Sequence, residues 1–412
     1  MSLFELRKKS SKEVDGKFTP SELKSMAISG EISPEDEIRE AEKGKWHKAK
    51  SVNGLKFDQP DNKEDNFSGA FLTSSESKEN AVNLFSKVGL KVGQIAQTEQ
   101  VKFSSVKPLF KEIFASHDAI ELEAYFAVGL PSTTPTIEEM ETELKPWVFI
   151  RCMLFFALSF LLLWIGWAKY HNINLIPGII LVGSFAFPFS FIIFFFECNL
   201  PKNISLYTVV KYFVWGGILG ILFSLFLFDN DLGTTSIFGA SVAGIIEEPA
   251  KLAAVLLLAR SRDFNWSLNG ICLGAAVGAG FAAFESAGYA LNILLISGNM
   301  DTMLDNIYLR GLLSPFAHVI WTAIAAGAFW RVKKSGGFEF NMLLKEKFLR
   351  PMIFVMALHF LWNSPIPSIL PFFLGYILLG IIGWILVLGL VFGGIKEIQQ
   401  AKGQASIDSS RN

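Results

Sequence analysis

The sequence of 412 residues has few cysteines, almost no net charge and no long apolar core near its N-terminus. Its three cysteines, Cys152, Cys198 and Cys272, lie in or beside apolar segments without CxxC spacing, so we expect them to be reduced, buried and inert. The net charge of -1 indicates no acidic or basic partner and no nucleic acid. Because the N-terminal residues contain no long apolar core, we expect no cleaved signal peptide. We also expect the N-terminal part of the chain to stay in the cytosol.

Long apolar segments fill the second part of the chain. Apolar residues make up 51% of the sequence and aromatic residues 14%, and the apolar ones are concentrated after Lys145. Most of the apolar segments reach the about 20 residues that a helix needs to cross about 30 Å of hydrocarbon, and the seventh is short. We therefore expect an all-α membrane protein, a polytopic bundle of about eight transmembrane helices with a small cytosolic α+β domain at its N-terminus. The eight segments lie at about 147–168, 176–196, 209–228, 236–259, 268–296, 311–330, 351–364 and 371–394.

Composition divides the chain into five parts. In the first part, FELRKK predicts a strand and TPSELKSMAISG a helix. A helical neck precedes the bundle, and in it His117 is expected to be a solvated surface residue. The predicted boundaries are 1–60 for the α+β domain, 61–80 for a polar linker, 81–145 for the neck, 146–396 for the bundle and 397–412 for a polar tail.

Lysines and arginines are distributed unevenly between the two sides of the predicted bundle. The loops on the side of the N-terminus carry nearly all of them, whereas the opposite loops carry only Lys169 and Arg310. Since positive loops stay inside, we expect an integral, multi-pass protein with both termini in the cytosol.

Ionisable residues cluster within the apolar part. The first three segments and the eighth have none away from their ends, whereas segments four to seven have six. A carboxylate at the centre of a membrane helix costs at least about 2.5 kcal/mol, and such residues usually face one another inside the bundle. We therefore expect these four consecutive segments to enclose one polar site. The six residues are Glu247, Glu248, Lys251, Glu285, His318 and His359.

The fourth segment contains the run EEPAK, in which Glu247 and Lys251 are spaced i,i+4 with the acid first. This is a favourable ion-pair geometry on a helix, so we expect Lys251 to hold Glu247 as a structural ion pair. Glu248 lies about 100° further round the helix. We expect it to turn toward the acid and the histidines of the following segments.

Two further spacings suggest contacts between helices. Gly270, Gly274 and Gly278 repeat at i,i+4 in the fifth segment and form a ridge of small residues suited to close helix packing. His359 and Asn363 are also spaced i,i+4, in the run HFLWN, and should lie on one helical face. An imidazole can act as a base or a ligand, and an amide N–H can stabilise an oxyanion.

The combination of EEPAK, FAAFE, a histidine in the sixth segment and HFLWN resembles the PrsW family of intramembrane proteases over about residues 145–395. That family belongs with the CAAX prenyl endopeptidases and bacteriocin-immunity proteins, whose pattern is E-E-x-x-x-R, F-x-x-x-H and H-x-x-x-N. Here Lys251 stands one position before the arginine of that pattern, and Glu285 stands where its second motif has histidine. Both departures are those of the PrsW branch.

The resemblance implies an intramembrane endopeptidase of a bacterial inner membrane that cuts single-span substrates, such as anti-sigma factors, near the outer face. In it Glu247 and Glu248 would supply the general base, and Glu285 and His318 would complete a water or metal site that His359 supports with Asn363. Two mechanisms stay open. Either a glutamate activates water without a metal, or one zinc ion is held by His318, His359 and a glutamate such as Glu285. The motif HExxH is absent. Because the possible ligands lie on different helices, their spacing in the sequence does not decide between the two mechanisms.

Two functions of other classes also fit buried charges. A proton- or ion-coupled transporter uses carboxylates and histidines as relays, and a membrane scaffold would recruit partners through its cytosolic domain.

Residues 1–60 resemble the GYF-like domain of bacterial membrane proteins, with Lys17 in place of the usual proline. This resemblance implies a cytosolic peptide partner bound by Phe18 and Trp46, which as an alternative would be core residues. The matching positions are Gly16, Phe18, Glu22, Leu23, Gly30, Ile32 and Trp46.

Overall fold

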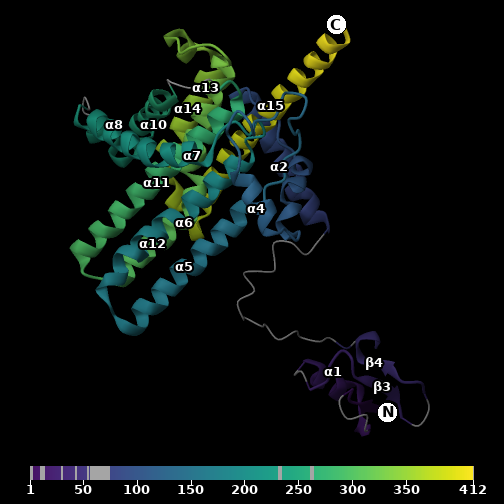
Figure 1. Cartoon of the computed structure of the whole chain (residues 1–412). Coiled ribbons are helices and arrows are strands. Elements are labelled where there is room, and N and C mark those ends of the chain that lie inside the picture. Colours follow the sequence, from purple (N-terminus) through teal and green to yellow (C-terminus); the bar gives the residue numbers. More distant parts are fainter. Residues whose placement is uncertain are drawn as a thin grey trace. The chain divides into compact units, whose positions relative to one another are not determined.

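The chain folds into two compact units, Met1–Lys78 and Glu79–Asn412, seen in a computed structural model (Figure 1). The structure describes residues 3–9, 14–28, 31–41, 44–52, 55, 75–230, 234–259 and 264–411. Most of the predicted linker, at 61–74, lies outside these residues. From Ser75 the chain is already helical, so the linker ends before residue 80, where we had placed its boundary.

The first unit is the expected α+β domain. Its strands form one antiparallel sheet in the order β2-β1-β3-β4, and a helix follows β2. The helix begins at a capping box, in which Thr19 Oγ1 accepts from the Glu22 amide and Glu22 Oε2 accepts from the Thr19 amide. Phe18, at the end of β2, packs against the buried core of this unit around Leu6. The elements are β1 (Phe4–Arg7), β2 (Val14–Phe18), α1 (Pro20–Ile28), β3 (Glu37–Glu40) and β4 (His47–Lys48).

The opposite face of this sheet is charged. Glu5 stands opposite Arg39 and Arg7 opposite Glu37 in the β1–β3 ladder, and both pairs form salt bridges. The two guanidinium groups lie 4.5 and 4.6 Å from the centroid of the Trp46 ring. Trp46 therefore contacts the arginines of this face and does not belong to the apolar core of the unit.

The second unit is helical and holds the rest of the chain. A π-helical turn, Tyr212–Gly216, joins α7 to α8. The three cysteines are free, as expected, and Cys198 and Cys272 are buried while Cys152 is half-buried. The helices are α2 (Ser75–Ala96), α3 (Phe103–Val106), α4 (Ala119–Phe126), α5 (Val148–Tyr170), α6 (Ile176–Glu197), α7 (Leu206–Lys211), α8 (Gly217–Asp229), α9 (Thr234–Phe238), α10 (Ala243–Ala259), α11 (Ser267–Ser297), α12 (Met300–Leu313), α13 (His318–Lys333), α14 (Glu346–Trp362) and α15 (Leu374–Arg411).

Six helical stretches of the described residues, rather than eight, are long and apolar enough to cross a membrane. The expected fourth and seventh spans are not among them. The fourth carries three charged residues, Glu247, Glu248 and Lys251, and α14 has only 17 residues. The apolar run before α10 is folded as the short helix α9 and a 3-10 turn, and α14 ends where the prolines of NSPIP begin. The six stretches are Val148–Tyr170, Ile173–Glu197, Leu206–Asp229, Ser267–Ser297, Met300–Lys333 and Leu374–Asp408.

Helix α11 contacts most helices of the bundle and packs most closely on α13. A Cβ added at Gly270, Gly274 or Gly278 would come 2.8, 2.4 or 2.2 Å from a backbone oxygen of α13. The predicted ridge of small residues is thus confirmed as a helix contact. It brings the start of α13, with His318, against the middle of α11.

The neck packs onto the bundle and shares its core. His117 was expected to be solvated, and this prediction is wrong. Its ring stacks on Trp147 with centroids 3.8 Å apart, and its Nδ1 lies 3.0 Å from Glu121 Oε2. The predicted polar tail continues α15, and Lys402 of that helix donates to the carbonyl oxygen of Met140.

Candidate active site

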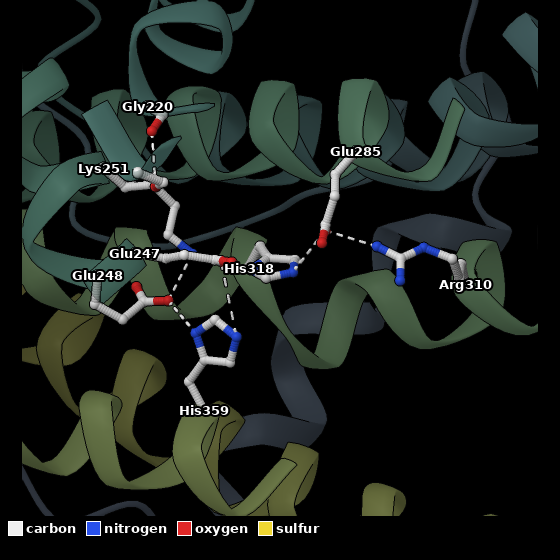
Figure 2. Close-up of polar contacts among 9 residues, drawn as sticks. Gly220, Glu247, Glu248, Lys251, Glu285, Arg310, His318 and His359 are labelled. Carbon is white, nitrogen blue, oxygen red and sulfur yellow. Dashed lines mark hydrogen bonds and ion pairs between the residues drawn. The ribbon is translucent and has the colours of Figure 1, made fainter. Parts of the chain in front are cut away.

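The ionisable residues of segments four to seven meet in one connected network, as expected (Figure 2). Helix α10 contributes Glu247, Glu248 and Lys251, and α11 contributes Glu285. The two histidines come from helix ends. His318 is the first residue of α13, and His359 lies in the last turn of α14.

His359 is held by Glu248. Its Nδ1 lies 2.7 Å from Glu248 Oε1, and its ring stacks on Trp321 with centroids 4.3 Å apart. Because a carboxylate can only accept, Nδ1 carries a proton, and Nε2 is the nitrogen left for another partner. That nitrogen faces Glu247, whose Oε2 is 3.9 Å away.

Lys251 pairs more closely with Glu248 than with Glu247, which corrects the expected pairing. Its Nζ lies 2.6 Å from Glu248 Oε1 and 3.6 Å from Glu247 Oε2. Spacings of i,i+3 and i,i+4 both bring side chains together on a helix, so tertiary context decides between them. Here Glu248 and Lys251 are fully buried, whereas the Glu247 side chain is 10% exposed.

His318 is approached from both sides. Lys251 Nζ lies 2.9 Å from its Nδ1, and Glu285 Oε2 lies 3.2 Å from its Nε2. An ammonium group only donates, so Nδ1 accepts and the proton of the neutral ring is on Nε2, facing Glu285. Of the expected partners of Glu248, His359 is confirmed, whereas His318 is contacted by Lys251, which links the two halves of the network.

Arg310 is a member of the network that sequence reasoning missed. Its Nη2 donates to Glu285 Oε2 at 2.6 Å, although we had assigned it to an outer loop. One signal was available. Glu285 has no lysine or arginine within four positions on its own helix, and a buried carboxylate needs a cation from elsewhere.

A cavity of about 940 Å³ lies beside the network. Its charged lining residues are Glu247, Glu285 and Arg310, whereas Glu248 and Lys251 lie behind it. The remaining lining comes mainly from the ends of α8, α10, α12 and α14, the turn before α10 and the segment after α14. His318, His359 and Asn363 also line the cavity. His359 and Asn363 therefore face the same cavity, as their i,i+4 spacing predicts.

Three of these residues could hold a metal ion. One ligand atom each of Glu247, His318 and His359 lies within 4.8 Å of the other two. Glu247 stands in this group in place of Glu285, which we had expected as the third ligand and which is held by Arg310.

The donor chemistry of this group fits a divalent cation. Glu247 Oε2 is buried without a hydrogen-bond partner. The described network contains three carboxylates and two cations, and the cations sit closest to Glu248 and Glu285, so Glu247 is the carboxyl group with the most distant cation. Lys251 Nζ also lies near His318, but its flexible stem can stay with Glu248 when another cation is present.

Comparison with known proteins gives one match. Residues 205–391 match the PrsW family of intramembrane metalloproteases. This region begins at α7 and contains every residue of the network, whereas α5 and α6, which we had included in the resemblance, lie before it. The match does not extend to residues 1–60, so their resemblance to a GYF-like domain is not supported.

Searches of curated proteins and of solved structures found no match to the chain. The assignment therefore rests on the family match together with the geometry of the network and the membrane-length helices around it. Residues 205–391 of this integral, multi-pass membrane protein are a PrsW family intramembrane metalloprotease domain.

Proposed function

We propose that the protein is an intramembrane zinc endopeptidase that hydrolyses a peptide bond in a membrane-anchored protein substrate. The group of Glu247, His318 and His359 carries the proposal, because it gathers one carboxylate and two imidazoles at the wall of a cavity. Two histidines and one glutamate form the ligand set of several catalytic zinc sites. A zinc ion bound there would supply Lewis acidity toward the peptide carbonyl and toward water.

Glu248 has a positioning role in this proposal rather than the role of a base. It is fully buried and does not line the cavity, so water bound near a substrate cannot reach it. By accepting from His359 Nδ1 it leaves Nε2 free to act as a ligand, which is the usual function of a carboxylate behind a metal-binding histidine. Lys251 donates to the same oxygen and balances its charge.

The cavity supplies the groups that would touch the substrate. In the described part of the chain Glu247 and Glu285 are the carboxylates that line it, and these two can accept a proton from water. Asn363 lies one helical turn after His359, and its amide can donate to the carbonyl oxygen, on which negative charge develops.

The site suits a substrate cut near the middle of the membrane. Glu285 lies about 18 Å from the end of α11 at Ser297, and half of about 30 Å of hydrocarbon is about 15 Å. A single-span protein of the anti-sigma-factor type, in a bacterial inner membrane, fits this depth. Buried carboxylates and histidines would also suit a transporter. Hydrolysis is favoured by the family match and by the group of Glu247, His318 and His359, which could hold a metal ion.

The test uses full-length protein in detergent, with a single-span reporter substrate, metal analysis and chelator treatment. We expect stoichiometric zinc and a loss of cleavage on chelation that zinc reverses. Glu247→Gln should abolish cleavage and zinc binding, whereas Glu248→Gln should weaken both by about 10–100-fold. Glu346→Gln is the matched control, because Glu346 is exposed on the same helix as His359.

Two results would contradict the proposal. Full activity in protein free of metal would remove the zinc mechanism. Unchanged cleavage in both Glu247→Gln and His359→Ala would remove the assignment of this cavity as the site of hydrolysis.

A further inference from the structure

Arg310 contacts the site from α12, outside the four runs that first indicated it. We propose that Arg310 is a positioning residue of the metal site, which holds Glu285 and through Glu285 fixes the ring of His318. The inference rests on the proposed zinc-dependent function, because its consequence is the affinity of that site for metal.

The guanidinium of Arg310 is fixed by three contacts (Figure 2 shows the first). Its Nη2 donates to Glu285 Oε2 at 2.6 Å, and its Nε donates to Ser286 Oγ at 3.0 Å. Its carbon Cζ lies 4.5 Å from the centroid of the Tyr289 ring. A planar cation held by two hydrogen bonds and an aromatic face has a defined direction, which a lysine would not have.

Arg310 in turn sets the position of Glu285. The Oε2 atom that accepts from Arg310 is the one that lies 3.2 Å from His318 Nε2. A carboxylate at this place favours the His318 tautomer with its proton on Nε2. The lone pair is then on Nδ1, the nitrogen on the side of Lys251 and Glu247.

The two histidines of the site have equivalent support. The far nitrogen of His359 is held by Glu248, which Lys251 holds, and the far nitrogen of His318 is held by Glu285, which Arg310 holds. In each case a cation on one helix keeps a carboxylate charged and directed at a histidine on another. Outer groups of this kind orient metal ligands, and their loss typically lowers metal affinity or activity by 10–100-fold.

A purely structural role for Arg310, as a tie between α11 and α12, makes a different prediction. It would lower thermal stability without changing the affinity for zinc. The measurement is therefore the zinc dissociation constant of full-length protein in detergent, determined by competition with a chromophoric chelator, with turnover of the reporter substrate as a second readout.

For Arg310→Gln we expect a zinc dissociation constant about 10–100-fold higher than in wild type, and a fall in kcat with little change in KM. Arg350→Gln is the matched control, because Arg350 pairs with Glu346 on the exposed face of α14 and should bind zinc normally. A wild-type dissociation constant in Arg310→Gln would overturn the inference.

A second comparison tests whether Arg310 acts through Glu285. Glu285→Gln and the double variant Glu285→Gln with Arg310→Gln should bind zinc equally, because the arginine has lost the partner through which it acts. A further tenfold loss in the double variant would overturn the inference. This comparison still tests the inference if the single variant Arg310→Gln does not fold. The double variant removes both charges of the pair, so neither is left without its partner.

These outcomes separate the inference from the proposed function. Wild-type protein that binds no zinc contradicts the proposed function, and the inference with it. Zinc binding by wild type that is unchanged in Arg310→Gln contradicts the inference alone.

Discussion

Replacing Gly278 by alanine should damage the proposed metal site, although Gly278 is neither a proposed ligand nor a cavity residue. Gly278 lies on α11 where it packs against the start of α13. A Cβ there would come 2.2 Å from the carbonyl oxygen of His318 and 2.8 Å from Thr322 Oγ1. Ordinary carbon–oxygen contacts are about 3.3 Å or longer, so the backbone at His318 has to move by about 1 Å.

The stability and activity changes should differ in size. Overpacking costs about 1–3 kcal/mol, whereas alanine is favoured over glycine by about 1 kcal/mol inside a helix. The net destabilisation is then about 0–2 kcal/mol, which leaves the protein folded. A displacement of about 1 Å at a reacting group, in contrast, can cost about 100-fold in rate. We expect Gly278→Ala to reduce turnover about 100-fold and to weaken zinc binding.

Gly288→Ala on the same helix is the control. A Cβ at Gly288 has nothing within 4 Å, so this substitution should keep full activity and raise thermal stability slightly. The assay combines thermal unfolding, turnover of the reporter substrate and chelator competition for both variants. Turnover of Gly278→Ala within twofold of Gly288→Ala would refute the idea that this helix contact fixes the position of His318.

Two further predictions concern other parts of the chain. A Cβ at Gly244 would come 3.0 Å from the carbonyl carbon of His359, so Gly244→Ala should push α14 away and lower zinc affinity, and unchanged affinity in a chelator competition would contradict this. In the first unit, hydrogen bonds from Lys48 and then Lys50 lower the pKa of Glu35 from 4.5 to about 2. A lowered carboxyl pKa stabilises the fold above the ordinary pKa, and this contribution is lost as the pH falls toward 2. A carboxyl NMR titration, with Glu35→Gln to identify the signal, should show this value, and a midpoint near 4.5 would show that the pairs do not form.

The location of the site could be predicted from the sequence because buried charge is expensive. Segments four to seven contain the ionisable residues, and a membrane leaves them no partner other than one another. The pairing within the site could not be predicted in the same way. On α10, Glu247 and Glu248 are both within reach of Lys251, and the choice depends on which carboxylate faces the cavity.

Contacts between distant segments account for the other differences. Arg310 sits near the end of α12, where an arginine is also expected to reach toward the membrane surface, so its role needed the position of Glu285. The residues next to His117 in the sequence do not indicate that it is buried. The ring that stacks on it belongs to Trp147, which lies 30 residues later in the chain. The glycine ridge could be predicted because its spacing alone places three small residues on one face.

The cavity lies where two helices of the bundle end. Hydrolysis needs water as a reactant, and hydrocarbon does not supply it. Helices α10 and α14 carry Glu247 and His359, and the cavity is lined by the residues at the start of the first and the end of the second. Glu285 lies instead within the long helix α11, and it lines the same cavity. The proposed hydrolysis therefore depends on the space between these helix ends, which can admit water and substrate to carboxylates on a short and on a long helix alike.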